Sequence, residues 1–192
     1  MTTEQIKELC CRKQEELIEK YFSNIVREAT IECIKTRRSV REYAANTSID
    51  ETTIKELISI ALWAPSGKNT QPWRVKIVTE RQLIKCIADT TPRNRWIAEC
   101  GCLLIVYLDK KRSYDYVKDV QSCGAFMQTL LLAAHSIGID TCWVGGILKI
   151  DDQISSLIGV NDDFELMGLI TMGVGTSKHR VSKRLEINEI LL

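Results

Sequence analysis

The sequence predicts an α+β fold in which helices pack against a single sheet. Apolar residues recur at helical spacing in the first ~35 residues, in the segment that begins at Asp50–Glu51, and in residues 120–137. Between and after these segments lie short apolar runs that are typical of strands. With 192 residues, 45% of them hydrophobic, the chain has the size and composition of one compact globular protein.

Three segments predict the longer helices. The first ~35 residues are expected to form one or two helices, because their apolar residues are spaced as on a helix face: Ile6, Leu9, Cys10, Leu17, Tyr21, Ile25 and Val26. The second helix begins at Asp50–Glu51 and stops at Ala64–Pro65, since the residue before a proline disfavours helix. The third, from Val120 to Ile137, is apolar enough to lie in the core or in a subunit interface, and Gly138 ends it.

Four segments predict strands. Trp73, Val75 and Ile77 alternate with basic residues, which is the pattern of a half-buried strand. The run from Cys102 to Leu108 is apolar throughout, as expected of a central strand that is covered on both faces. Residues 139–144 and 166–172 complete the sheet, and a helix that begins at Asp151–Asp152 lies between them.

The charge balance argues against several classes of function. Lys and Arg number 26 against 25 Asp and Glu, so the net charge of +1 offers no global field for nucleic acid or an anionic membrane surface. No apolar run approaches the roughly 18 residues of a transmembrane helix, and the N-terminus lacks the pattern of a secretory signal. We therefore expect a cytoplasmic protein with neither nucleic-acid nor membrane partners.

The eight cysteines do not predict a metal or redox site. Cys10–Cys11 and Cys100–Gly101–Cys102 lack the two-residue spacer of zinc and redox motifs, and the chain has only two histidines. Several other cysteines lie in apolar periodic segments, where free thiols behave as small hydrophobic residues. We expect reduced cysteines and no bound metal.

A cluster of arginines suggests a phosphate site. Residues 37–41 read Arg-Arg-Ser-Val-Arg, which places three guanidinium groups and a hydroxyl where a helical pattern ends. Guanidinium groups bind phosphate through two parallel hydrogen bonds, and a serine hydroxyl adds another donor. A solvated basic helix end is the more frequent explanation of such a cluster.

Two loops could meet a flat heterocyclic ligand. Residues 64–73 read Ala-Pro-Ser-Gly-Lys-Asn-Thr-Gln-Pro-Trp, in which prolines fix the path and carboxamides offer donors and acceptors. Gly145 and Gly146 follow a strand, where the lack of side chains would let backbone N–H groups come close to a ligand. An ordinary connecting loop and a strand-ending turn are the plainer alternatives.

Taken in order, these segments resemble the nitroreductase family of FMN enzymes over about residues 33–192. The matching blocks are Arg37–Arg41, Ala64–Trp73, and residues 125–146, the last of which ends in Cys-Trp-Val-Gly-Gly. The resemblance implies a three-layer α/β/α fold with a mixed, mainly antiparallel sheet. It also implies an intertwined homodimer with FMN at the interface, and an N-terminal helical extension (residues 1–32) that packs on a single FMN-binding domain (residues 33–192).

The resemblance also implies a set of cofactor-binding residues. Arg37, Arg38 and Ser39 would hold the phosphate and ribityl chain together with a C-terminal basic residue, for which Arg184 is chosen over Lys183 or Arg180. Arg41 would approach the pyrimidine end of the ring and support it electrostatically, with no catalytic side chain required. The partner subunit would supply Pro65, Ser66, Gly67, Asn69 and Gln71, and the ring would meet the chain at Val144, Gly145 and Gly146.

The implied activity is reduction of a nitroaromatic, a quinone or a similar small acceptor by NADH or NADPH, in a ping-pong cycle. The chain has no Gly-x-Gly-x-x-Gly fingerprint to hold a nicotinamide dinucleotide permanently. This absence favours a cycle in which the nicotinamide and the electron acceptor occupy the same pocket in turn. The alternatives are a flavin-dependent dehalogenase or biosynthetic dehydrogenase of the same fold, and a non-catalytic FMN-binding protein. The stretch between Asp109 and Asp119 is too short for the covering helices of longer family members, so we expect an open pocket or a lid from elsewhere, such as the N-terminal helix.

Overall fold

The computed structural model describes residues 3–45, 47–176 and 181–192, with side chains from residue 12 onward. It divides into two compact units, Met1–Arg37 and Arg38–Leu192. The first unit contains one uninterrupted helix, α1 (Thr3–Thr36), of 34 residues, where the sequence predicted one or two pieces. Several large apolar side chains of α1 are exposed, among them Leu17, Tyr21 and Phe22.

The second unit contains a four-stranded sheet in the order β1-β2-β4-β3. Its strands are β1 (Trp73–Val78), β2 (Cys102–Asp109), β3 (Asp140–Val144) and β4 (Phe164–Gly173), which confirms the four predicted strands. Every neighbouring pair is antiparallel. A parallel bridge between Ser39 and Thr141 adds the arginine segment to the sheet beside β3.

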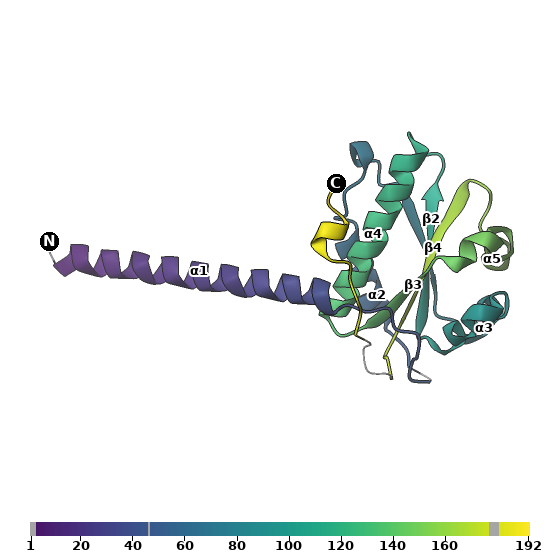
Figure 1. The fold of residues 1–192 in the computed structure, drawn as a ribbon, viewed down its shortest axis with the longest axis horizontal. Coiled ribbons are helices and arrows are strands. Elements are labelled where there is room, and N and C mark those ends of the chain that lie inside the picture. Colours follow the sequence, from purple (N-terminus) through teal and green to yellow (C-terminus); the bar gives the residue numbers. More distant parts are fainter. Residues whose placement is uncertain (1–2, 46, 177–180) are drawn as a thin grey trace. The chain divides into compact units, whose positions relative to one another are not determined.

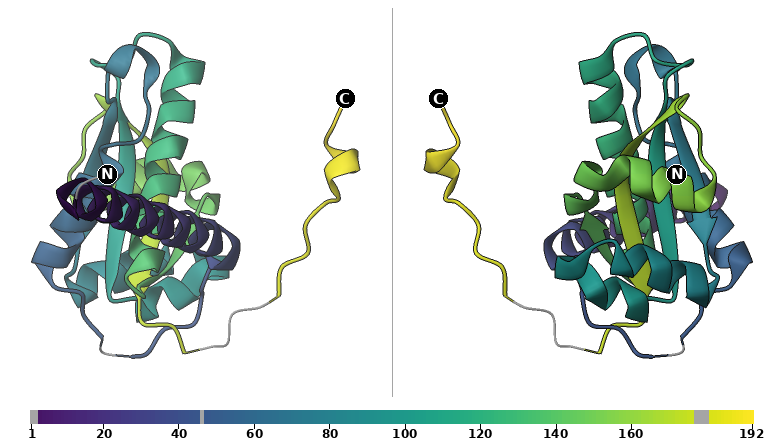
Figure 2. Two further views of the ribbon diagram at one scale, coloured as in Figure 1. Left: turned by 90° about the vertical axis from the view of Figure 1, so that its left-hand side faces the viewer. Right: turned by 90° about the vertical axis from the view of Figure 1, so that its right-hand side faces the viewer.

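Helices cover both faces of the sheet and make three layers, as predicted (Figures 1 and 2). Helices α2 (Glu51–Ala61) and α4 (Tyr116–Ser136) pack on one face, where Leu104 and Val106 of β2 lie in their core. Helices α3 (Arg81–Asp89) and α5 (Asp151–Ile158) and the 3-10 helix η2 (Pro92–Glu99) pack on the other face, with Leu103 and Ile105. Strand β2 is buried along its whole length because consecutive side chains enter opposite cores.

Side chains and glycines set the helix ends. The Asp50 carboxylate accepts a hydrogen bond from Thr53 N at 2.8 Å and so caps α2, and Asp115 caps α4 in the same way through Lys118 N at 3.2 Å. Gly138 ends α4 with a φ of 79°, a left-handed conformation that favours glycine. Within the part of the chain that the structure describes, no helix is long and apolar enough to cross a membrane.

Candidate functional site

Residues 38–45 lie at the end of the sheet where β3 begins. Val40 N donates to Thr141 O at 3.0 Å, and Ala44 N donates to Val174 O at 2.8 Å. Val40 is buried, whereas Ser39 and Arg41 on either side of it are exposed. The sheet therefore fixes the backbone of the arginine segment while it leaves Ser39 and Arg41 open to solvent.

Tyr43 ties this segment to the core. Its hydroxyl lies 2.7 Å from Thr171 Oγ1 and donates to Val40 O at 2.9 Å. Its ring packs flat against β4, where a Cβ on Gly173 would lie 2.7 Å from Tyr43 Cδ1, so this position requires glycine. Burial raises the pKa of Tyr43 far above its ordinary value, and the group stays a neutral anchor.

The helix η2 brings two further side chains to the same region. The Arg41 guanidinium carbon lies 5.9 Å from the centroid of the Trp96 ring, and Asn94 Nδ2 lies 3.8 Å from where a Cβ on Gly146 would stand. The arginine segment and the paired glycines therefore border one common element. Sequence analysis missed Asn94 and Trp96 because a short 3-10 helix with a non-helical residue inside shows no hydrophobic period.

Gly145 and Gly146 follow β3 and are exposed, whereas Val144 before them is buried. Gly145 has a φ of −87°, which any residue adopts, and nothing lies within 4 Å of where its Cβ would stand. Packing within the described residues therefore gives no reason for glycine at position 145, and the open space would let a ligand approach the backbone. Four residues of strand, about 13 Å, separate Gly145 from Thr141 beside the arginine segment.

The loop before β1 is held in a strained conformation. Lys68, Asn69 and Gln71 have φ values of 50°, 55° and 48°, which are rare for residues with a side chain and cost on the order of 1–3 kcal/mol each. Ser66 Oγ accepts a hydrogen bond from Gln71 N at 3.1 Å and so closes the turn. Strain of this kind persists where the surroundings impose it, and it is concentrated at functional loops.

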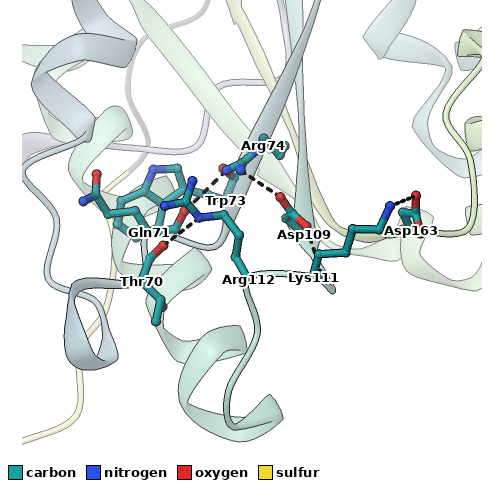
Figure 3. A network of polar contacts seen from close by, with 8 residues as sticks. All are labelled: Thr70, Gln71, Trp73, Arg74, Asp109, Lys111, Arg112 and Asp163. Atoms are coloured by element: carbon teal, nitrogen blue, oxygen red, sulfur yellow. Dashed lines mark hydrogen bonds and ion pairs between the residues drawn. The ribbon is translucent and has the colours of Figure 1, made fainter.

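A polar network holds the C-terminal end of this loop against the sheet (Figure 3). Arg74 forms an ion pair with Asp109 at 2.7 Å and donates to Trp73 O at 2.7 Å, while Arg112 Nε donates to Thr70 O at 3.2 Å. Trp73 itself stacks on Phe126 of α4, with the two ring centroids 5.1 Å apart. These contacts connect the loop to both β2 and α4.

The start of α4 supports the middle of the loop. Gly67 N donates to Ser122 Oγ at 3.4 Å, and the Tyr114 ring lies directly against Gly67. The Lys68 ammonium lies 4.7 Å from the centre of the same ring. A side chain at Gly67 would therefore displace Tyr114, a constraint that the sequence alone does not show.

The two groups of predicted residues lie at opposite ends of the sheet. The loop leads into Trp73, which pairs with Leu108 at one end of β2. The arginine segment pairs with Thr141, which pairs with Met172, and Met172 pairs with Cys102 at the other end of β2. The six-residue rise from Cys102 to Leu108 along β2 separates the two groups by about 20 Å, so one chain does not bring them together.

The remaining basic candidates belong to the N-terminal unit and to the C-terminal tail. Arg37 is the last residue of the N-terminal unit. Arg184 donates hydrogen bonds to Ser182 Oγ and Lys183 O within the C-terminal tail, and Arg180 lies outside the described residues. A cavity of about 660 Å³ between α5 and the start of β4 contains none of the predicted residues in its lining.

Three of the buried cysteines supply no reactive thiolate. Burial raises the pKa of Cys100, Cys102 and Cys123 to about 12, so these thiols stay protonated at neutral pH. All three are fully buried. Among the described residues, no group of His, Cys, Asp or Glu side chains is arranged to hold a metal ion.

Comparison with known proteins identifies the family to which the chain is similar. The model of the nitroreductase family matches residues 34–91 and 87–174. A protein of Archaeoglobus fulgidus described as an NADH dehydrogenase/NAD(P)H nitroreductase is 29% identical over 148 residues, which cover 74% of this chain and 84% of that protein. A Pseudomonas protein named as a Cr(VI) reductase is 28% identical over 177 residues, which cover 83% of this chain and 72% of that protein.

Solved structures agree with this match. A Desulfovibrio desulfuricans protein described as a nitroreductase, crystallised in complex with FMN, has a TM-score of 0.79 and 26% identity; the match covers 85% of this chain and 95% of that one. The three-layer fold and the family model point the same way. The chain belongs to the nitroreductase family.

Proposed function

We propose that this protein is an FMN-dependent oxidoreductase that takes electrons from NADH or NADPH and reduces a nitroaromatic, a quinone or a similar small acceptor. The observation that carries the proposal is the separation of the two predicted groups. Each group is anchored to the sheet and has exposed residues, and about 20 Å along β2 lies between them. A homodimer would let the loop of one subunit meet the arginine segment of the other.

The residues present fit an FMN molecule. Arg38 and Ser39, with Arg37 before them, would hold the phosphate, since guanidinium groups and a hydroxyl favour a phosphate monoester. The open backbone at Gly145 and Gly146, about 13 Å away, would accommodate a flat ring. The second subunit would contribute Pro65, Ser66, Gly67, Asn69 and Gln71, and Arg184 of the tail would add a charge at the phosphate.

When bound, the flavin supplies the electron transfer between a reduced nicotinamide and the acceptor. The chain's own residues would position it: Arg41 would place a positive charge where negative charge builds up on reduction. The strained loop would hold its carboxamides in place without paying for ordering at each binding event. Donor and acceptor would use the same open slot in turn, in a ping-pong cycle.

The test is reconstitution of the purified protein with FMN. We expect a yellow complex whose flavin absorption bleaches on addition of NADH or NADPH and returns with a nitroaromatic or a quinone. Arg38→Ala together with Arg41→Ala should weaken FMN binding by about 100-fold, because two charge-assisted contacts are lost. Lys85→Ala on α3 removes an exposed cation elsewhere and is the matched control.

Two results would contradict the proposal in different ways. Failure of the protein to take up FMN would reject the cofactor and the function with it. A stable FMN complex that neither NADH nor NADPH bleaches would favour the non-catalytic FMN-binding protein, or a dehalogenase or dehydrogenase that draws electrons from another source.

The N-terminal helix belongs to the same proposal. We propose that residues 1–32 pack on the globular part of this chain or its partner, because an isolated helix with exposed Leu17, Tyr21 and Phe22 gains stability by burying them. Phe22→Ser should lower the melting temperature by several degrees, whereas Ser23→Ala next to it should leave it unchanged. Equal melting temperatures for both variants, measured by circular dichroism, would contradict this packing.

A further inference from the structure

We propose that Trp96 is the positioning residue that holds the Arg41 guanidinium in place for the bound flavin. The inference rests on the proposed function and extends it to η2, an element that the sequence analysis did not connect with the site. It is carried by one juxtaposition: the Arg41 guanidinium carbon lies 5.9 Å from the centroid of the Trp96 ring.

This contact is the one that orients Arg41. Within residues 12–45, 47–176 and 181–192, no ion pair or hydrogen bond involves the Arg41 guanidinium, and the residue is exposed. A guanidinium over an indole face is attracted by the negative potential of the ring. Because the ring cannot accept the in-plane N–H bonds of the guanidinium, these remain available for a ligand.

Trp96 is itself held from two sides. Its ring centroid lies 6.4 Å from that of Tyr43, which is buried and tied to Thr171 of β4. At the C-terminal end of η2, Arg81 of α3 donates to Ala98 O at 2.7 Å and also to Cys100 O. A continuous set of contacts thus runs from β4 through Tyr43 and Trp96 to Arg41.

A fixed arginine matters because a free one loses side-chain entropy when it binds. An exposed arginine samples many rotamers, and ordering one of these on ligand binding opposes affinity. Stacking on Trp96 restricts the guanidinium before the ligand arrives. Part of the side-chain entropy of Arg41 is therefore lost when the protein folds and not when the ligand binds. The expected signature is a loss of FMN affinity on removal of the indole that depends on the presence of Arg41.

The test is a double-mutant cycle on the full-length protein, with the dissociation constant for FMN measured by quenching of flavin fluorescence. Trp96→Leu removes the ring and keeps an apolar side chain, and it should weaken FMN binding about three- to tenfold. In the Arg41→Ala background, the same substitution should change the dissociation constant less than about twofold. Arg95→Ala, a neighbouring exposed guanidinium of η2, should leave FMN binding unchanged.

Trp96→Phe separates stacking from folding. Phenylalanine keeps an aromatic face with a weaker attraction for a cation, so its affinity should fall between those of the wild type and Trp96→Leu. It also keeps the inference testable if Trp96→Leu fails to fold. An affinity for Trp96→Phe equal to that of the wild type or below that of Trp96→Leu would overturn the inference.

The remaining outcomes also decide the matter. An equal loss from Trp96→Leu with and without Arg41 would show that the indole acts only through packing, and would overturn the positioning role while the proposed function stands. If Trp96→Leu left FMN affinity unchanged in the protein that retains Arg41, the positioning role would also be overturned while the proposed function stands. Wild-type protein that takes up no FMN would instead reject the proposed function, and this inference with it.

Discussion

At the scale of the residue, Gly67 shows how one absent side chain determines the path of the site loop. A Cβ at this position would lie 2.8 Å from Cε1 of the Tyr114 ring, closer than van der Waals contact allows. The backbone of Gly67 itself is not in a left-handed conformation. The requirement for glycine therefore comes from Tyr114 and not from the turn.

Gly67→Ala should destabilise the protein by about 1 kcal/mol or less, because the added methyl group displaces the Tyr114 ring, which is 38% exposed and can move toward solvent. The double variant Gly67→Ala, Tyr114→Ala should be no less stable than Tyr114→Ala alone, since the clash is then absent. Urea denaturation of the four proteins measures both effects. Additive losses in the double variant would mean that Gly67 serves another purpose.

Asp119 orders the turn that presents Tyr114. Its Oδ2 accepts hydrogen bonds from Ser113 Oγ at 2.8 Å, Tyr114 N at 2.9 Å and Asp115 N at 3.0 Å. Burial opposes the charged form of Asp119, but these hydrogen bonds outweigh it and hold the pKa of the carboxyl below its ordinary value. The charged form of Asp119 is therefore part of the folded state.

This lowered pKa makes stability depend on pH in a defined direction. The contribution of Asp119 is fully present above the ordinary carboxyl pKa of 3.8 and is lost as the pH falls through the lower folded value. The wild type should therefore lose more unfolding free energy below about pH 4 than Asp119→Asn, which does not titrate. Denaturant unfolding at pH 7 and at acid pH gives the comparison, and parallel losses in both proteins would exclude this role.

At the scale of the element, α4 links the core to the site loop. Phe126 of α4 is fully buried and stacks on Trp73, the first residue after the loop. The same helix provides Ser122, which accepts a hydrogen bond from Gly67 N. A change in the core face of α4 should therefore reach the loop.

Phe126→Ala should lower the unfolding free energy by about 3–5 kcal/mol, because it removes a buried ring and leaves a cavity. It should also weaken FMN binding through the displaced Trp73. Val117→Ala on the same helix is the control, since Val117 is 64% exposed and its loss should matter little. Chemical denaturation and FMN titration test the pair, and unchanged FMN affinity in a folded Phe126→Ala protein would separate α4 from the site.

At the scale of the whole molecule, the site loop and the arginine segment lie at opposite ends of the sheet. This arrangement predicts that each binding site is built from two subunits. Consider one subunit that carries Arg38→Ala and Arg41→Ala, and a second that carries Asn69→Ala and Gln71→Ala. In a symmetric dimer with sites built from both subunits, a mixed dimer has one site with both sets of changes and one site with none. Neither parent protein has an intact site.

Co-expression of the two variants should restore FMN binding to about a quarter of all sites, because random pairing makes half of the dimers mixed and each mixed dimer has one intact site. Flavin absorption per protein and nitroreductase turnover measure the recovery. If both groups of residues served a site within one chain, mixing would restore nothing.

The sequence by itself determined the four predicted helical segments, the four strands and the family, because periodicity and ordered motifs are local properties of the chain. It did not reveal α3 or η2, since helices of nine and eight residues are stabilised mainly by packing of residues such as Ile84 and Ile97. Only the tertiary structure decided that the two motifs lie at opposite ends of β2 and that Trp96 lies beside Arg41. Strand order, strand direction and side-chain contact between residues far apart in sequence depend on how the whole chain packs, which no local pattern encodes.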